Sequence, residues 1–219
     1  MSTILMIARH GNTFGPDDTP VRVGARTDLP LVESGMMQAH QLGRFLDIRG
    51  FSPDVVYTSR LMRTKQTAQI AIEGANTHAQ IIAHDFFNEI DYGPDEGMPE
   101  DKVIERIGEA AIEQWDRDAV PPPGWHVDPD ALIKGWQDFA GSLLTKHHGQ
   151  HILVVTSNGI ARFAPHIAGN FDTFARDNRI KLATGAISLL THTDRDGWQI
   201  DFWNLKPRDW LNEHGHGDE

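Results

Sequence analysis

The sequence predicts an α/β fold with a mostly parallel central sheet flanked by helices. Two observations lead to this prediction. Short runs that are largely apolar recur at residues 4–8, 54–57 and 152–156, and such runs are typical of parallel strands buried on both faces. Segments that favour helix follow these runs, and strands that alternate with helices build layered α/β domains.

The first part of the chain is expected to contain two strand–helix units. After the strand at 4–8 comes a loop rich in Gly, Pro and Asp, and then a helix from about residue 33 to 48, where apolar residues recur at helical spacing. The strand at 54–57 is followed by a second helix. Thr58 or Ser59 is expected to cap that helix, since hydroxyl side chains accept hydrogen bonds from the first helical N–H groups.

The stretch from about residue 93 to 148 differs from the rest of the chain. It is polar, and it contains a Pro-Pro-Pro-Gly run at 121–124. We interpret it as a helical insertion or lid with helices near 100–117 and 129–147. Because no convincing boundary divides the chain, residues 1–219 are expected to form a single domain that carries this insertion.

The last part of the chain is expected to complete the sheet. The strand at 152–156 ends in Ser-Asn-Gly at 157–159, where another helix begins. Residues 185–193 and 198–203 alternate like a pair of strands, and Asp-Arg-Asp-Gly at 194–197 is a suitable turn between them.

Composition excludes several classes of function. Cysteine is absent, so disulfides and thiolate catalysis are excluded, and the formal net charge of −11 disfavours binding to nucleic acid or to anionic membranes. No apolar run approaches the length of a membrane span, and the N-terminal residues do not resemble a signal peptide. We therefore expect a cytoplasmic protein with no nucleic-acid or membrane partner. Any phosphate site must be a local basic pocket.

Three strand ends place polar residues where a ligand would bind. His10 follows the first strand, Arg63 follows the second, and Ser157 follows the third. Ligands of open α/β sheets bind at the carboxyl ends of the strands. These residues can therefore meet in one crevice although they lie far apart in the sequence.

The Arg9-His10-Gly11 tripeptide suits phosphoryl transfer. A neutral imidazole is a competent nucleophile, provided that a hydrogen bond holds it in one tautomer. The planar guanidinium of Arg9 matches phosphate oxygens, and Gly11 lets the backbone approach an anion. Taken alone, the tripeptide is equally compatible with Arg9 as a surface ion-pair partner.

Longer segments resolve this ambiguity by resemblance. Residues 4–13, residues 55–63 with Thr-Ala after them, residues 88–93, and the closing Trp and Trp-Asn at 198–204 resemble, in order, the signature segments of the histidine phosphatase (phosphoglycerate mutase-like) superfamily. The likeness covers nearly the whole chain outside 98–148. It implies phosphoryl transfer on a phosphoglycerate mutase-like α/β fold.

The resemblance also implies roles for individual residues. His10 falls on the nucleophile, which would form a phosphohistidine intermediate, and Glu89 falls on the proton donor. Arg9 and Arg63 fall on the phosphate-binding arginines. Auxiliary phosphate contacts are expected from Asn12 and Thr13. No metal or other cofactor is expected, because the arginines supply the positive charge that a metal would bring.

The chain departs from the family at the end of the third strand. The family pattern there is Val-Ser-His-Gly-Gly, and its histidine completes the phosphate pocket, whereas Ser157 stands at that position here. Ser157 and Asn158 are expected to bind phosphate as neutral donors. Losing one charge-assisted hydrogen bond costs about 1.5–3 kcal/mol, which is roughly a ten- to a hundredfold loss of rate. Arg162, one helical turn after Asn158, is expected to have a structural role.

These residues favour a phosphomonoester phosphatase that acts on a phosphorylated small molecule. Two alternatives stay open. The substitution at 157 favours a weak or inactive member that binds a phosphorylated ligand or a partner protein. The other alternative is phosphoryl transfer of the phosphoglycerate mutase type, but the segment 93–148 has few basic residues to hold a second phosphate. The sequence determines neither the substrate nor the oligomeric state.

Overall fold

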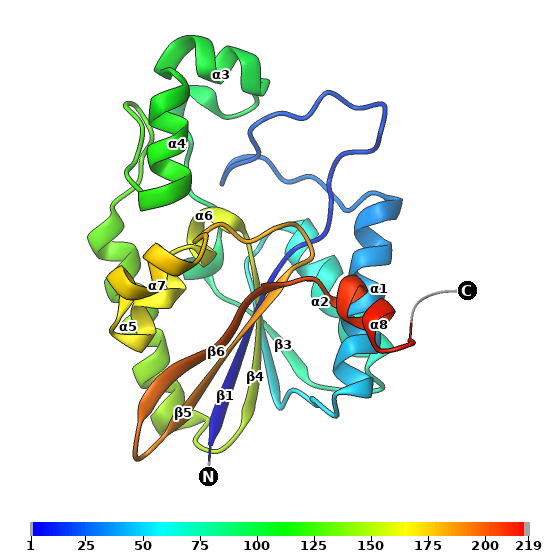
Figure 1. Ribbon diagram of the computed structural model, residues 1–219. Helices are drawn as coiled ribbons and strands as arrows, with labels where there is room; N and C mark the ends of the chain where they lie inside the picture. The colour runs from blue at the N-terminus through cyan, green and yellow to red at the C-terminus, as the bar shows by residue number, and fades with distance from the viewer. Residues whose placement is uncertain (1, 217–219) are drawn as a thin grey trace.

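Residues 2–216, which the computed structural model describes, contain one mixed sheet with the strand order β3-β2-β4-β1-β5-β6 (Figure 1). Four neighbouring strands, from β3 to β1, are parallel, and the last two are antiparallel. The predicted mostly parallel α/β fold is therefore confirmed. The strands are β1 (Thr3–Arg9), β2 (Val55–Thr58), β3 (Gln80–Ala83), β4 (His151–Thr156), β5 (Ile187–Thr193) and β6 (Gly197–Leu205).

The two central strands are apolar along their length because both of their faces are covered. Leu5 of β1 and Ile152 of β4 belong to the core on one side of the sheet. Met6 and Leu153, which pair in the parallel register, belong to the core on the other side. All four side chains are buried. Burial on both faces explains why these runs lack the polar alternation of a half-exposed strand.

Helices α1 (Glu33–Ile48), α2 (Met62–Gly74) and α8 (Pro207–Glu213) lie on one side of the sheet (Figure 1). The bounds of α1 agree with the predicted helix. α1 and α2 approach closely where Gly43 faces Gly74, since a Cβ on Gly43 would lie 2.9 Å from Gly74 Cα. This contact packs α2 closely against α1.

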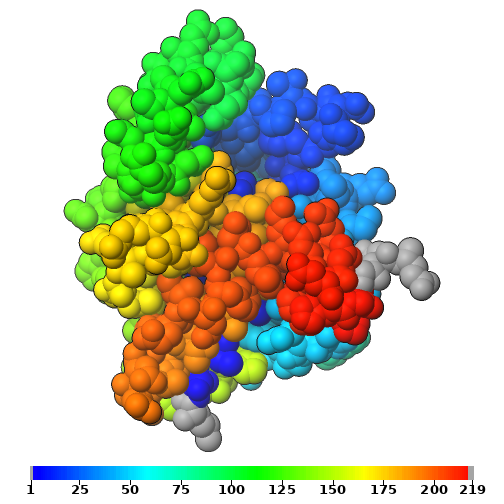
Figure 2. Space-filling model, viewed as in Figure 1, coloured from blue at the N-terminus to red at the C-terminus, as the bar shows by residue number. Residues whose placement is uncertain are grey.

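The other side of the sheet is covered by α5 (Pro129–Lys146), with α3 (Glu100–Ile107) and α4 (Glu109–Asp118) beyond the strand ends (Figure 1). The prediction of one helix over 100–117 was wrong. Gly108 has φ +82°, a backbone conformation that ends α3 and starts α4 in a new direction. Figure 2 shows this insertion side by side with the loop that follows β1.

One further expectation needs correction, and one strand was not predicted. Neither Thr58 nor Ser59 caps α2, because Thr58 belongs to β2 and α2 begins only at Met62. The backbone N–H of Met62 instead donates to Asp28 Oδ1 at 2.6 Å, so a distant loop caps the helix. The strand β3 was not predicted, since only two of its four residues are aliphatic isoleucines at an edge of the sheet.

The short elements that complete the chain lie around the third strand end. α6 (Asn158–Ala161) begins where a helix was predicted, and α7 (Phe171–Asp177) was not predicted. Short 3-10 helices occupy Asp85–Phe87, Gly93–Asp95 and Ala164–Ala168. Among residues 2–216, no helix combines the length and the apolar composition that a membrane crossing requires.

The contact between α1 and α2 predicts opposite effects of two Gly→Ala substitutions. A Cβ at Gly43 would lie 2.7 Å from Ala71 O, whereas a Cβ at Gly141 of α5 would meet open space. We expect Gly43→Ala to destabilise the fold by about 1–3 kcal/mol through overpacking. Gly141→Ala should stabilise it by up to about 1 kcal/mol through helix propensity. Urea unfolding of both variants measures the difference, and equal midpoints would contradict the close packing.

Candidate active site

A cavity of about 420 Å³ opens at the carboxyl ends of the parallel strands, between the loop after β1 and the insertion. Most of the predicted site residues line it. These are Arg9, His10, Asn12, Thr13, Glu89 and Asn158. Arg63 and Ser157 are not among the described residues that line the cavity; Arg63 directly contacts His10, and Ser157 directly precedes Asn158.

His10 is held as a neutral imidazole with a defined tautomer. Its Nδ1 lies 2.7 Å from Gly11 O, so Nδ1–H donates to this carbonyl and Nε2 keeps its lone pair. Arg63 Nε donates to that lone pair at 3.2 Å. Burial, together with the positive charges of Arg9 and Arg63, lowers the pKa of His10 well below its ordinary value. The ring therefore stays uncharged at neutral pH.

Arg63 is fully buried behind His10. Its remaining donors go to backbone carbonyls of the loop after β1: NH1 donates to Thr27 O at 2.7 Å, and NH2 lies 3.4 Å from Gly24 O. The guanidinium thereby ties α2, the loop and the imidazole together. In this structure it orients His10 and places positive charge beside it.

Arg9 and Asn12 flank His10 on the cavity wall. Arg9 NH1 donates to Leu182 O at 2.7 Å, while Arg9 Nε is buried without a partner in residues 2–216. The backbone N–H of Asn12 donates to Gln38 Oε1 at 2.8 Å. A Cβ on Gly11 would collide with the backbone of Gly35 in α1. Gly11 is thus required by the packing of this loop against α1, rather than by an approach to an anion.

Glu89 is a buried carboxyl group on the same cavity. Oε1 accepts from the Ile90 backbone N–H at 2.9 Å, and Oε2 accepts from the Gly159 N–H at 3.3 Å. A Cβ on Gly159 would collide with the Glu89 carboxyl, so glycine is needed here. Burial raises the pKa of Glu89, although both hydrogen bonds and the charges of Arg63 and Arg9 oppose the rise. Glu89 therefore keeps its proton to a higher pH than an exposed glutamate.

Ser157 and Asn158 differ in their relation to the cavity. Ser157 is fully buried, and its Oγ has no hydrogen-bond partner in the part of the chain that the structure describes. Asn158 lines the cavity, and its Oδ1 accepts from the Leu182 N–H at 2.9 Å. The amide Nδ2 is then the donor that Asn158 can offer to a ligand.

The cavity also contains residues that sequence reasoning missed. Trp115 and Asp116 of α4 line it, together with Arg22 and Lys181. Arg162 lines it too, although a structural role was expected. Arg162 follows Asn158 by four residues, and this spacing was the available signal, since residues i and i+4 share a helix face. Trp115 and Asp116 carried no signal, because only the tertiary fold brings α4 over the strand ends.

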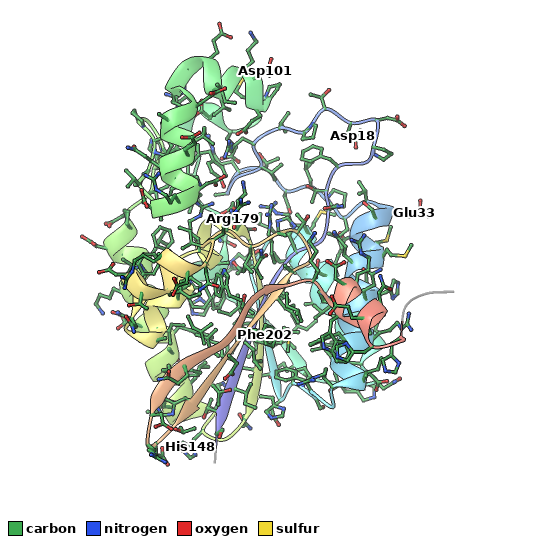
Figure 3. All side chains as sticks on the ribbon, in the orientation of Figure 1. Asp18, Glu33, Asp101, His148, Arg179 and Phe202 are labelled. Carbon is green, nitrogen blue, oxygen red and sulfur yellow. The ribbon has the colours of Figure 1, made fainter. Side chains whose placement is uncertain are left out.

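The outer part of the cavity is lined by paired charges. Lys181 Nζ lies 2.7 Å from Asp116 Oδ2, and Arg22 forms an ion pair with Glu100. In Figure 3 the label Arg179 marks the segment that carries Lys181. This segment lies just below α4 in that view. The loop marked by Asp18 in Figure 3 lies next to α3, across the cavity from the segment that carries Lys181.

Comparison with known proteins identifies relatives of this chain. The family model described as "Histidine phosphatase superfamily (branch 1)" matches residues 5–206. A 2,3-bisphosphoglycerate-dependent phosphoglycerate mutase of Methylorubrum extorquens (strain PA1) is 30% identical over 165 residues, which cover 74% of this chain and 77% of the mutase.

Solved structures share the fold. A mycobacterial glucosyl-3-phosphoglycerate phosphatase matches with a TM-score of 0.71 and 16% identity, over 94% of this chain and 100% of that one. The phosphoserine phosphatase of Entamoeba histolytica, solved in complex with 3-phosphoglyceric acid, matches with a TM-score of 0.72 and 17% identity, over 93% and 97% of the two chains. At these identities the likeness establishes the fold alone.

The raised pKa of Glu89 makes a prediction about stability. The folded state binds this proton more tightly than the unfolded state, so its contribution to stability is present at low pH and is lost as pH rises through the folded-state pKa. Above that pKa the buried carboxylate is a cost that Glu89→Gln removes, while the Gln amide can accept only one of the two backbone hydrogen bonds that Glu89 accepts. We therefore expect the Tm of Glu89→Gln relative to the wild type to rise as the pH is raised, on top of a pH-independent loss from the missing hydrogen bond. Thermal melts across pH 5–8 measure the rise.

The control for this experiment is Glu213→Gln, which removes the same charge from an exposed position. Its melting temperature should differ little from that of the wild type across the same range. A Tm of Glu89→Gln relative to the wild type that stays constant or falls between pH 5 and 8 would contradict the cost assigned to the buried carboxylate.

Proposed function

Because the chain belongs to branch 1 of the histidine phosphatase superfamily, we propose that it is a phosphomonoester phosphatase with His10 as its nucleophile and Glu89 as its proton donor. One observation carries the proposal. A neutral histidine and a buried carboxyl group with a raised pKa line the same cavity. Environments that push a base and an acid toward opposite protonation states are typical of acid–base chemistry at neutral pH.

In the first step the phosphoryl group moves to His10. Arg9 binds the phosphoryl oxygens, and the Nε2 lone pair attacks phosphorus. The bond from phosphorus to the ester oxygen breaks, and Glu89 delivers its proton to that oxygen, so the alcohol leaves neutral. Arg63 Nε, which occupies the Nε2 lone pair in this structure, turns to a phosphoryl oxygen during the attack.

In the second step water hydrolyses the phosphohistidine. Glu89 is now a carboxylate, and it takes a proton from the water as the water oxygen attacks phosphorus. The P–N bond breaks and its electron pair returns to Nε2. Inorganic phosphate leaves, Glu89 is protonated again, and the hydrogen bond from Arg63 re-forms. No metal or other cofactor enters either step.

The outer cavity supports hydrolysis of a monophosphate over mutase chemistry. A mutase must hold a bisphosphorylated intermediate, which requires positive charge beyond the reacting phosphate. Here the outer cations face carboxylates: Arg22 pairs with Glu100, and Lys181 pairs with Asp116. A second phosphate would meet these carboxylates as well as the cations. A phosphorylated small molecule with one phosphate group fits this balance of charge.

The nucleophile can be tested directly. We expect the wild type to hydrolyse a generic aryl phosphate and His10→Ala to lose essentially all of this activity with an unchanged circular dichroism spectrum. Brief incubation with labelled substrate, quenched in alkali where phosphohistidine survives, should label the wild type but not the variant. His78→Ala, which changes an exposed histidine outside the cavity, is the matched control and should keep both properties.

Other outcomes of the same experiment favour the alternatives. Equal hydrolysis by wild type and His10→Ala would exclude His10 as the nucleophile. Interconversion of 2- and 3-phosphoglycerate that depends on 2,3-bisphosphoglycerate, and that is faster than phosphate release, would favour a mutase. Phosphate binding without turnover of any ester would favour a binding protein.

A further inference from the structure

The cavity contains an arginine that the proposed mechanism leaves without a role. Arg162 follows α6 and is fully buried. Its guanidinium lies over the ring of Trp115, with Cζ 3.9 Å from the ring centroid, and NH1 donates to the Trp115 carbonyl. Nε lies 3.4 Å from Asn158 O. The insertion, through Trp115, therefore holds this cation in a fixed orientation at the cavity wall.

One nitrogen of this guanidinium has no acceptor. Arg162 NH2 is buried and has no hydrogen-bond partner among the residues that the structure describes. Asp116 Oδ1 lies 3.5 Å from it, a long ion-pair distance, while Asp116 Oδ2 contacts Lys181 at 2.7 Å. A charged N–H group that is buried without an acceptor is costly. It is therefore positioned to bind an acceptor that enters the cavity.

The cavity shows where that acceptor would lie. Arg162 shares the cavity wall with Arg9, Glu89 and Asn158. Arg9 Nε is also buried without a partner in residues 2–216. Burial and, to a smaller extent, the nearby charge of Arg9 lower the pKa of Arg162 to about 10 against the opposing effects of Tyr92, Asp116 and Glu89, so Arg162 remains a cation at neutral pH. Two cations with free buried donors on one wall make an anion site.

We propose that Arg162 NH2 donates to an oxygen of the bound phosphoryl group, and that Asp116 competes with this group for the same nitrogen. The inference rests on the proposed function in taking the bound anion to be the phosphoryl group of the substrate. Arg162 then supplies the charged donor that motif resemblance expects from a histidine at position 157, where the chain has a buried serine.

The proposal gives the insertion a role in the active site. α4 supplies both the Trp115 carbonyl and ring, which orient Arg162, and the Asp116 carboxylate, which limits its charge. When an anion binds Arg162 NH2 in place of Asp116, the Asp116 carboxylate pairs with Lys181 alone. The outer ion pair therefore responds to occupancy of the phosphate site.

The test measures binding of inorganic phosphate and of vanadate by calorimetry, together with aryl phosphate hydrolysis. We expect Arg162→Gln to weaken phosphate binding and kcat/KM by about ten- to a hundredfold, the effect of one charge-assisted hydrogen bond. Arg162→Lys should recover only part of the loss, because an ammonium lacks the planar fork. Arg195→Gln removes the same charge from the exposed β5–β6 turn and is the control.

Asp116→Asn distinguishes direct competition from general electrostatics. Removing the competitor should tighten phosphate binding more in the wild-type background than in the Arg162→Gln background, since the nitrogen for which Asp116 competes is then gone and only the loss of its charge beside Lys181 remains. If Asp116 acts only through its charge, the gain is equal in the two backgrounds, and the proposal is wrong. A purely structural Arg162 predicts wild-type phosphate affinity in folded Arg162→Gln, which would also overturn it.

The outcomes separate this inference from the proposed function. If Arg162→Gln does not fold, Arg162→Lys takes its place in both comparisons. A protein that hydrolyses no ester, yet shows the expected pattern of phosphate affinity, would refute the phosphatase and keep the anion site. A His10-dependent phosphatase whose phosphate affinity does not change when Arg162 or Asp116 is substituted would support the phosphatase and refute the anion site.

Discussion

The parallel pairing of β1 with β4 is the constraint on which the rest of the site depends. Arg9 pairs with Thr156 in the register, and the His10 N–H donates to Thr156 O at 3.0 Å, so the ladder continues into the first residue of the loop. The next residues on both strands therefore leave the sheet at the same edge. His10 and α6 meet there as a consequence of backbone hydrogen bonding rather than of any attraction between their side chains.

Burial then determines the protonation of the groups collected at this edge. The protein as a whole carries a formal net charge of −11, yet the cations Arg9 and Arg162 line its cavity and Arg63 lies directly behind His10. Water is largely excluded from them, so each is tied to backbone carbonyls that satisfy part of its hydrogen-bonding capacity. The same burial lowers the pKa of His10 and raises that of Glu89. One physical cause thus disfavours the charged form of both groups.

Several polar groups at the site are buried without hydrogen-bond partners within residues 2–216, although folding stability alone would favour satisfying them. Arg9 Nε, Arg162 NH2 and Ser157 Oγ are buried without hydrogen-bond partners in the described chain. Groups of this kind reduce stability unless a ligand satisfies them. Those of Arg9 and Arg162 belong to residues that line one cavity, so a single bound ligand could satisfy both.

Residues close together in the sequence could be interpreted from local pattern alone. The apolar runs gave β1 and β4, the periodicity gave α1 with its observed bounds, and strand ends pointed to the edge where His10 lies. Local pattern failed for the start of α2, where the distant Asp28 and not a neighbouring hydroxyl caps the helix. The helix expected at 100–117 is divided by Gly108, a local signal that the expectation did not use.

The amino-acid sequence by itself determined the layered α/β fold and the position of Arg9 and His10 at a strand end, because strand periodicity depends on local chemistry, whereas Glu89 was expected at the site only through the resemblance to the family. Only the tertiary structure decided that Arg63 lies behind His10, that Ser157 is buried off the cavity lining, and that Trp115 and Asp116 reach the site. The physical reason is that burial and hydrogen-bond competition depend on which distant segments pack together, and no local pattern specifies this.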